Sequence, residues 1–151
     1  MEDVFDVAEY VLQMTDCITT MKLQKLVFYS HAYSLVHYGS PLVPGHFEAW
    51  RNGPVLPELF QAHKGKFLIA PGEIKKHASP LCDRSMTIVK LVVKCLGQKT
   101  GRELSVMTHS EDPWKDARGT LDPSSASNAQ IGNVAIREFY STKAIDNPLF
   151  Q

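Results

Sequence analysis

The sequence predicts a mainly helical fold, a single compact domain of six or seven helices. The chain has 151 residues, 44% of them apolar and 21% charged, as expected for one globular domain with a real core. Apolar residues recur at helical spacing through most segments, and capping residues bracket several of these. Only residues 46–50 and 66–70 are expected to be extended, or to form a short β-hairpin.

Two helices are predicted in the first quarter of the chain. Residues 3–14 form the first, with Val4, Val7, Ala8 and Val11 on one face. Residues 20–38 form the second, which Thr19 or Thr20 can cap and Gly39 can end in left-handed geometry. This second helix is apolar nearly all round and is therefore expected to be buried as the hub of the fold; its apolar positions are Leu23, Leu26, Val27, Phe28, Ala32, Tyr33, Leu35 and Val36.

Two more helices are expected in the middle of the chain. After a turn at residues 52–54, a short helix over residues 55–64 has Pro57 in its first turn, where a missing N–H costs little. Residues 66–80 contain two prolines and a glycine and read as a mobile surface connection. The helical pattern then returns over residues 81–96.

Three short helices are predicted in the C-terminal third of the chain. Thr100 and Glu103 form a capping box, and Pro113 suits the first turn of the next helix. Asn133 is expected to cap the last helix. The domain is placed at residues 3–143. Residues 144–151 form a tail whose apolar end either docks or frays.

Several classes of protein and site are disfavoured. No apolar run approaches the length that spans a bilayer, and the acidic N-terminus lacks the basic start of a secretory signal, so we expect a cytoplasmic protein. The three cysteines, Cys17, Cys82 and Cys95, are widely spaced and are expected to be reduced thiols. The six histidines show no metal-binding spacing, and no Gly-rich phosphate loop occurs, so neither a metal nor another cofactor is expected.

The net charge is zero but unevenly distributed. Residues 1–21 carry five acids and no Lys or Arg, residues 22–102 carry twelve basic residues against four acids, and residues 103–151 carry four against seven. The basic middle could attract an acidic partner or nucleic acid, or the charges could neutralise one another in space. No nucleic-acid-binding motif is present, so the sequence gives no support for nucleic acid as a partner. Lys22 and Lys25 lie at the positive end of a predicted helix, which suggests a nearby carboxylate.

One segment resembles an acid-base cluster. His109, Glu111 and Asp112 lie close together in the sequence, and with Lys22 they could form the active site of a hydrolase-like enzyme. The alternative is a loop between two helices, in which Glu111 or its neighbour caps the next helix and His109 packs or bonds the backbone. The residues alone leave both interpretations open.

Several motifs together resemble the SocA-like Panacea antitoxin domain, found in antitoxins and in phage-associated proteins such as GepA. The first is the run Lys22-Leu23-Gln24-Lys25-Leu26, followed by Tyr29. The others are Glu48-Ala49-Trp50, then Gly53-Pro54-Val55, and Thr108-His109 with Glu111 and Pro113-Trp114. The resemblance implies a helical, non-enzymatic module that binds and neutralises a cognate toxin by direct protein–protein contact. It also implies a possible second partner, a cytosolic protease to which the toxin is delivered.

The resemblance also implies a set of candidate residues for partner binding. We expect Trp50 to pack against the second helix, Glu48 to lie near Lys22 or Lys25, Gly53 to give the backbone room, and Pro54 to start the next helix. The rim of the resulting groove would include Tyr29, Arg51 and Asn52. The full set of candidates is Lys22, Gln24, Lys25, Tyr29, Glu48, Trp50, Arg51, Asn52, Gly53, Pro54, His109, Glu111 and Trp114.

Overall fold

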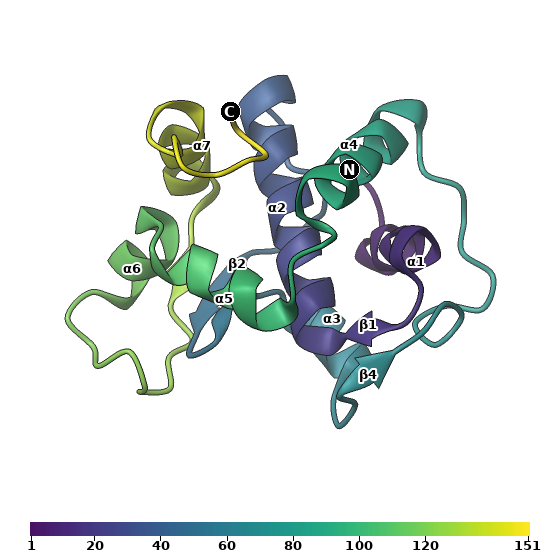
Figure 1. Ribbon diagram of the computed structural model, residues 1–151, viewed down its shortest axis with the longest axis horizontal. Coiled ribbons are helices and arrows are strands. Elements are labelled where there is room, and N and C mark those ends of the chain that lie inside the picture. The colour runs from purple at the N-terminus through teal and green to yellow at the C-terminus, as the bar shows by residue number, and fades with distance from the viewer.

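The computed structural model describes all 151 residues and confirms a mainly helical fold with small antiparallel sheets (Figure 1). The helices are α1 (Val4–Thr15), α2 (Thr20–Tyr38), α3 (Pro57–His63), α4 (Asp83–Leu96), α5 (Gly101–His109), α6 (Asp112–Arg118) and α7 (Asn133–Thr142). The strands are β1 (Ile18–Thr19), β2 (Phe47–Trp50), β3 (Gly53–Val55), β4 (Leu68–Ile69) and β5 (Gln130–Ile131).

Helix α2 is the hub of the fold, as its all-round apolar pattern predicts. It contacts α1, α4, α5 and α7, which surround it in Figure 1. The hydroxyl of Thr19 accepts a hydrogen bond from the Lys22 N–H at 3.1 Å, and Gly39 ends the helix with φ 70°. Both caps are those expected from the sequence. Twelve of its nineteen residues are buried, so the helix is held mainly by packing rather than by intrinsic propensity.

The strands form two small antiparallel sheets. β1 pairs with β4, and β2 lies between β3 and β5. The two extended pieces expected from the sequence are present as β2 and β4. Strand β5 was not foreseen, because its pairing of Ile131 with Phe47 joins residues far apart in the sequence.

Two predicted helix starts are wrong. Pro54 does not begin a helix but lies in β3 opposite Ala49, and α3 begins at Pro57. A proline is tolerated there because β3 is an edge strand. Asn133 does not cap α7: Gly132 holds that position, and the Asn133 side chain instead bonds the ring of His31 at 3.0 Å. The predicted capping box of Thr100 is present.

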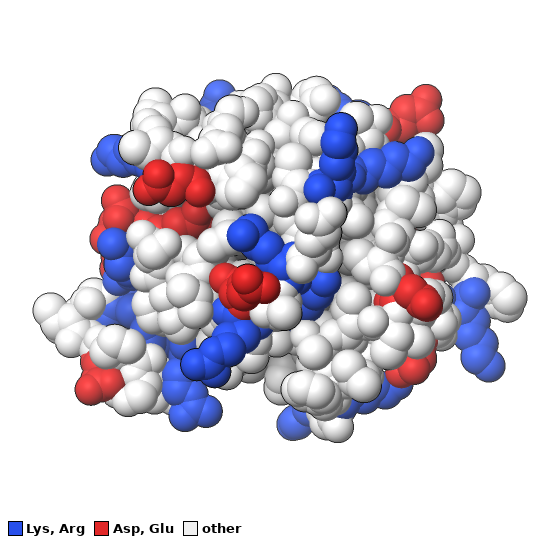
Figure 2. Space-filling view, viewed as in Figure 1, with Lys and Arg blue, Asp and Glu red and all other residues white.

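Two basic side chains from the middle of the chain pair with acids, and one of these acids, Asp6, lies in the acidic N-terminal segment. Lys75 pairs with Asp6 at 2.8 Å, and Lys66 pairs with Glu73 at 2.7 Å. On the face shown in Figure 2, acidic side chains lie among the basic ones. None of the helices combines the length and the apolar character needed to cross a bilayer.

Candidate functional site

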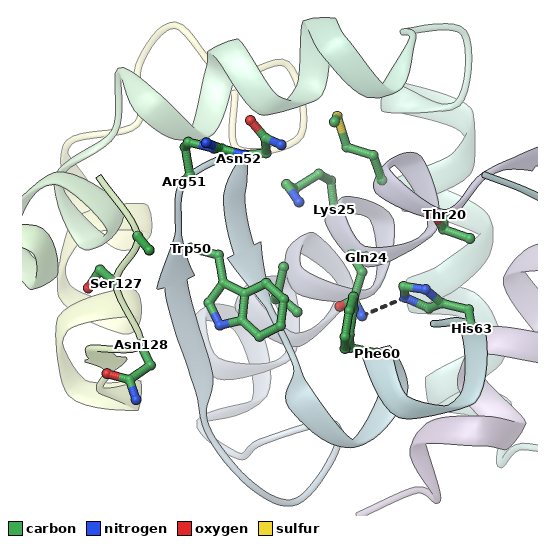
Figure 3. A pocket seen from close by; sticks show the side chains of 13 residues that line it. Thr20, Gln24, Lys25, Trp50, Arg51, Asn52, Phe60, His63, Ser127 and Asn128 are labelled. Atoms are coloured by element: carbon green, nitrogen blue, oxygen red, sulfur yellow. Dashed lines mark hydrogen bonds between the residues drawn. The ribbon is translucent and has the colours of Figure 1, made fainter. Parts of the chain in front are cut away.

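A surface pocket of about 680 Å³ opens between the start of α2, the β2–β3 turn, α3 and the loop that precedes β5 (Figure 3). Its walls combine aromatic and aliphatic side chains with amides, hydroxyls and cations, and no lining residue is acidic. The lining residues are Thr20, Met21, Gln24, Lys25, Trp50, Arg51, Asn52, Val55, Phe60, His63, Ala126, Ser127 and Asn128.

Lys25 forms the floor of this pocket. Its side chain is only 1% exposed, and Figure 3 shows its ammonium group inside the pocket. None of the three ion pairs in the protein involves Lys25, and its ammonium makes no hydrogen bond within the protein but keeps slight access to solvent at the pocket. Burial lowers the pKa of Lys25 to about 7, because the charged form has lost most of its water without gaining an anion. A buried cation without a partner is costly to the fold and marks a candidate binding site.

Gly53 makes room for the stem of this lysine. A Cβ atom at position 53 would lie 2.4 Å from Cε of Lys25 and 2.8 Å from the hydroxyl of Thr108. Its φ of 115° is also one that residues with side chains rarely adopt. The prediction that Gly53 gives the backbone room is therefore confirmed, and the group that occupies this room is the aliphatic part of Lys25.

Gln24 fixes the pocket wall beside Lys25. Its Oε1 accepts a hydrogen bond from the Leu56 N–H at 3.0 Å, which leaves its amide nitrogen as the donor toward Nε2 of His63 at 3.0 Å. His63 Nε2 is thus an acceptor, so the ring is neutral with its proton on Nδ1. Burial, together with the nearby Lys25 charge, lowers the pKa of His63 and maintains that state.

Trp50 and Phe60 form the aromatic wall of the pocket, with their ring centroids 4.8 Å apart and edge to face. Trp50 therefore packs on α3, and it shares the pocket lining with Gln24 and Lys25 of α2. The indole N–H of Trp50 donates to the Glu48 carboxylate at 2.8 Å. Neither Lys22 nor Lys25 forms an ion pair with Glu48, whose carboxylate is instead bonded by the indole of Trp50.

Helix α6 supports the pocket from behind. The indole N–H of Trp114 donates to the carbonyl of Trp50 at 2.7 Å, and the Arg118 guanidinium donates to that of Ala49 at 2.9 Å. Arg118 also donates to the carbonyls of Asp122, Pro123 and Ser125, and so shapes the loop that carries the lining residues 126–128. His109 stacks on Trp114 with ring centroids 4.0 Å apart.

A separate buried cluster surrounds Glu111, away from the pocket. The Glu111 carboxylate accepts hydrogen bonds from the hydroxyls of Tyr29 at 2.5 Å and Tyr140 at 2.7 Å, and from the Asn147 amide at 2.8 Å. Burial raises the pKa of Glu111 despite these bonds. The expectation that Tyr29 lies on a groove rim is wrong, because the side chain is fully buried. The cluster joins α2, α6, α7 and the C-terminal segment, which therefore packs onto the domain.

The structure does not bring the proposed acid-base residues into one cleft. The His109 ring stacks on Trp114, Glu111 is enclosed by its three donors, and the Lys22 ammonium donates to the Gly97 carbonyl at 2.6 Å. None of the three lines the pocket. No group of three His, Cys, Asp or Glu side chains is arranged to hold a metal ion.

Five of the sequence-predicted residues do meet at the pocket: Gln24, Lys25, Trp50, Arg51 and Asn52. The structure adds eight lining residues that the sequence analysis did not select. These come from the start of α2, from β3 and α3, and from the loop before β5, and only Val55 belongs to a motif named above; they are Thr20, Met21, Val55, Phe60, His63, Ala126, Ser127 and Asn128.

Comparisons with known proteins agree with the sequence motifs. Residues 23–115 match the model of the family described as "Antitoxin SocA-like, Panacea domain". Antitoxin SocA of Caulobacter vibrioides (strain NA1000 / CB15N) is 34% identical over 110 residues, which are 64% of this chain and 58% of that protein. The match thus spans less than two thirds of that relative's length. No solved structure matches the chain. The family match covers more than half of the chain and includes both tryptophan motifs, so the chain belongs to the SocA-like Panacea domain family.

Proposed function

We propose that this protein is an antitoxin that neutralises a cognate toxin protein by direct contact. The observation that carries the proposal is its membership of the SocA-like antitoxin family, together with the 34% identity to a protein named Antitoxin SocA. Fold alone does not identify a function, so the proposal also needs a surface that a partner can occupy.

The pocket over Lys25 is the surface that supports the proposal best. Eight of its thirteen lining residues fall within residues 23–115, the segment that matches the family. Arg51 and Asn52 are exposed at its rim, and Trp50 and Phe60 form an aromatic wall. Aromatic and arginine side chains are the usual anchors of protein interfaces. A partner that inserts a side chain here would bury this wall and meet the cation beneath it.

We propose further that the protein acts without catalysing a reaction. General acid-base chemistry needs its groups within hydrogen-bond reach of one substrate. Both Glu111 oxygens are already bonded to buried donors, and Lys22 is engaged by a backbone carbonyl. Glu111 and Lys22, which the acid-base interpretation requires, are thus engaged in contacts within the fold.

Co-expression tests the antitoxin proposal. The protein encoded beside this chain is expressed in a heterologous host, alone and together with the antitoxin candidate. We expect growth arrest by the neighbour alone, rescue by co-expression, and a complex of the two purified proteins. A neighbour that this chain neither binds nor neutralises would overturn the proposal.

The same experiment separates two mechanisms of neutralisation. Blocking by contact leaves the amount of toxin unchanged while growth recovers, whereas delivery to a cytosolic protease shortens the half-life of the toxin. Pulse-chase labelling of the toxin, with and without the antitoxin, measures that half-life. Because the pocket offers a partner an aromatic wall and a cation, we expect blocking by contact to suffice.

A further inference from the structure

We propose that the pocket over Lys25 receives an acidic side chain of the partner protein, whose carboxylate pairs with the Lys25 ammonium while its stem lies against the Trp50 and Phe60 rings. This inference rests on the proposed function, since the partner is the toxin. The inference adds the chemical feature, an acidic side chain, by which the pocket would recognise the toxin.

The first argument is the charge of the pocket. Arg51 and the protonated form of Lys25 are cationic, the His63 ring is neutral, and no acid lines the walls. The Lys25 ammonium is buried without an anion, although the protein pairs other lysines with carboxylates at 2.7 and 2.8 Å. A carboxylate entering the pocket would therefore compensate a charge that the fold leaves unpaired.

The second argument concerns why the lysine is present at all. Its aliphatic stem packs on Gly53, and an apolar side chain of similar length would pack there equally well. The charge itself bonds nothing within the protein, so the fold does not need it. A role in binding explains why a costly ammonium occupies this position.

The third argument selects a side-chain carboxylate over a phosphate group. Phosphates are usually held by several free backbone N–H groups at a helix start. At the start of α2, the Thr20 N–H donates to the Phe67 carbonyl at 3.0 Å and the Lys22 N–H donates to Thr19 at 3.1 Å. The pocket offers one ammonium at its floor and an aromatic wall above, which suits one carboxylate on an aliphatic stem.

Binding through Lys25 would depend on pH. The basic groups around it are His63 of α3 and Arg51 of the β2–β3 turn, which share the pocket lining, and His109 of α5. Burial, and to a lesser extent the Lys25 charge, lowers the pKa of both histidines. Because the pKa of Lys25 is about 7, its protonated fraction falls about tenfold between pH 6 and pH 8. The affinity for an anion should fall by about the same factor.

The test compares Lys25→Met with Lys22→Met as a matched control on the same helix. Lys22 donates to the Gly97 carbonyl and does not line the pocket. Binding of the purified toxin is measured by calorimetry from pH 6 to pH 8. We expect Lys25→Met to bind about 30-fold more weakly at pH 6, with no pH dependence, and to melt at or above the wild-type temperature. We expect Lys22→Met to retain wild-type affinity and pH dependence.

Toxin binding by Lys25→Met at wild-type affinity would overturn the pocket proposal and leave the antitoxin function standing. If the wild-type protein binds no toxin, the antitoxin function fails, and capped peptides then test the pocket alone. A peptide with an internal glutamate and an amidated C-terminus should shift the Lys25 and Trp50 resonances, whereas its glutamine counterpart should not. Equal shifts by both peptides, or stronger shifts by a glutamine peptide with a free C-terminus or by inorganic phosphate, would overturn the proposal.

Discussion

Gly53→Ala should destabilise the protein through two separable effects. The first is backbone strain at φ 115°, which costs about 1–3 kcal/mol for a residue with a side chain. The second is overlap, because the new Cβ would lie 2.4 Å from Cε of Lys25 and 2.8 Å from Oγ1 of Thr108. Overpacking of this kind costs about 1–3 kcal/mol more. The expected loss of unfolding free energy is therefore about 2–6 kcal/mol, a large part of a typical domain's stability.

A double-mutant cycle with Lys25→Ala isolates the second effect. That substitution removes the Cδ and Cε atoms with which the Cβ of an alanine at position 53 would clash, but it leaves the backbone strain in place. Urea unfolding of the four proteins, followed by circular dichroism, gives the coupling. We expect Gly53→Ala to cost about 1–2 kcal/mol less in the Lys25→Ala background. An equal cost in both backgrounds would refute the claim that Gly53 accommodates the lysine stem.

Three further predictions concern the buried Glu111 cluster and the loop that Arg118 shapes. Glu111→Ala leaves three buried donors without an acceptor, and each costs about 1–3 kcal/mol of unfolding free energy. The variant should therefore be largely unfolded, as a thermal melting curve would show. Burial raises the pKa of Glu111 in the folded protein. Its contribution to the unfolding free energy is therefore greatest below its pKa in the unfolded chain, and it is lost as the pH rises through its pKa in the folded protein. In urea titrations, the stability advantage of the wild-type protein over Glu111→Gln should shrink as the pH rises. Arg118→Ala should cost about 2–3 kcal/mol and speed hydrogen exchange in residues 119–129, and unchanged exchange there would contradict its role in shaping the loop.

The hub of the fold was predictable because its signals are local. The all-round apolar pattern of α2, the Thr19 cap and the left-handed Gly39 lie within about twenty consecutive residues, and each acts through its near neighbours. The capping box at Thr100 is local in the same way. Such features follow from periodicity and capping geometry without knowledge of the tertiary structure.

The site was only partly predictable because its contacts are not local. His63 meets Gln24 across 39 residues, and Trp114 meets the Trp50 carbonyl across 64. No spacing rule anticipates such pairs. The sequence indicated that Lys22 and Lys25 lie at the start of α2, where the helix dipole disfavours a positive charge, but it suggested a carboxylate partner for them. The structure instead leaves Lys25 facing an open pocket.

The buried tyrosine shows the same limit. A helical pattern places Tyr29 on a face of α2, but it does not reveal that Glu111 and Asn147, more than eighty residues away, close over its hydroxyl. An aromatic residue with a polar tip is equally compatible with an interface or with a core. Only the tertiary contacts decide between them.

The most direct measurement is the pKa of the Lys25 ammonium, determined by NMR on lysine labelled with ¹³C at Cε, in the free protein and in the complex with its toxin. We expect a pKa of about 7 in the free protein and a rise toward the ordinary lysine value of about 10.4 in the complex, because a carboxylate then faces the ammonium. A Lys25 pKa that stays the same when the toxin binds would contradict the central claim that this pocket holds an acidic side chain.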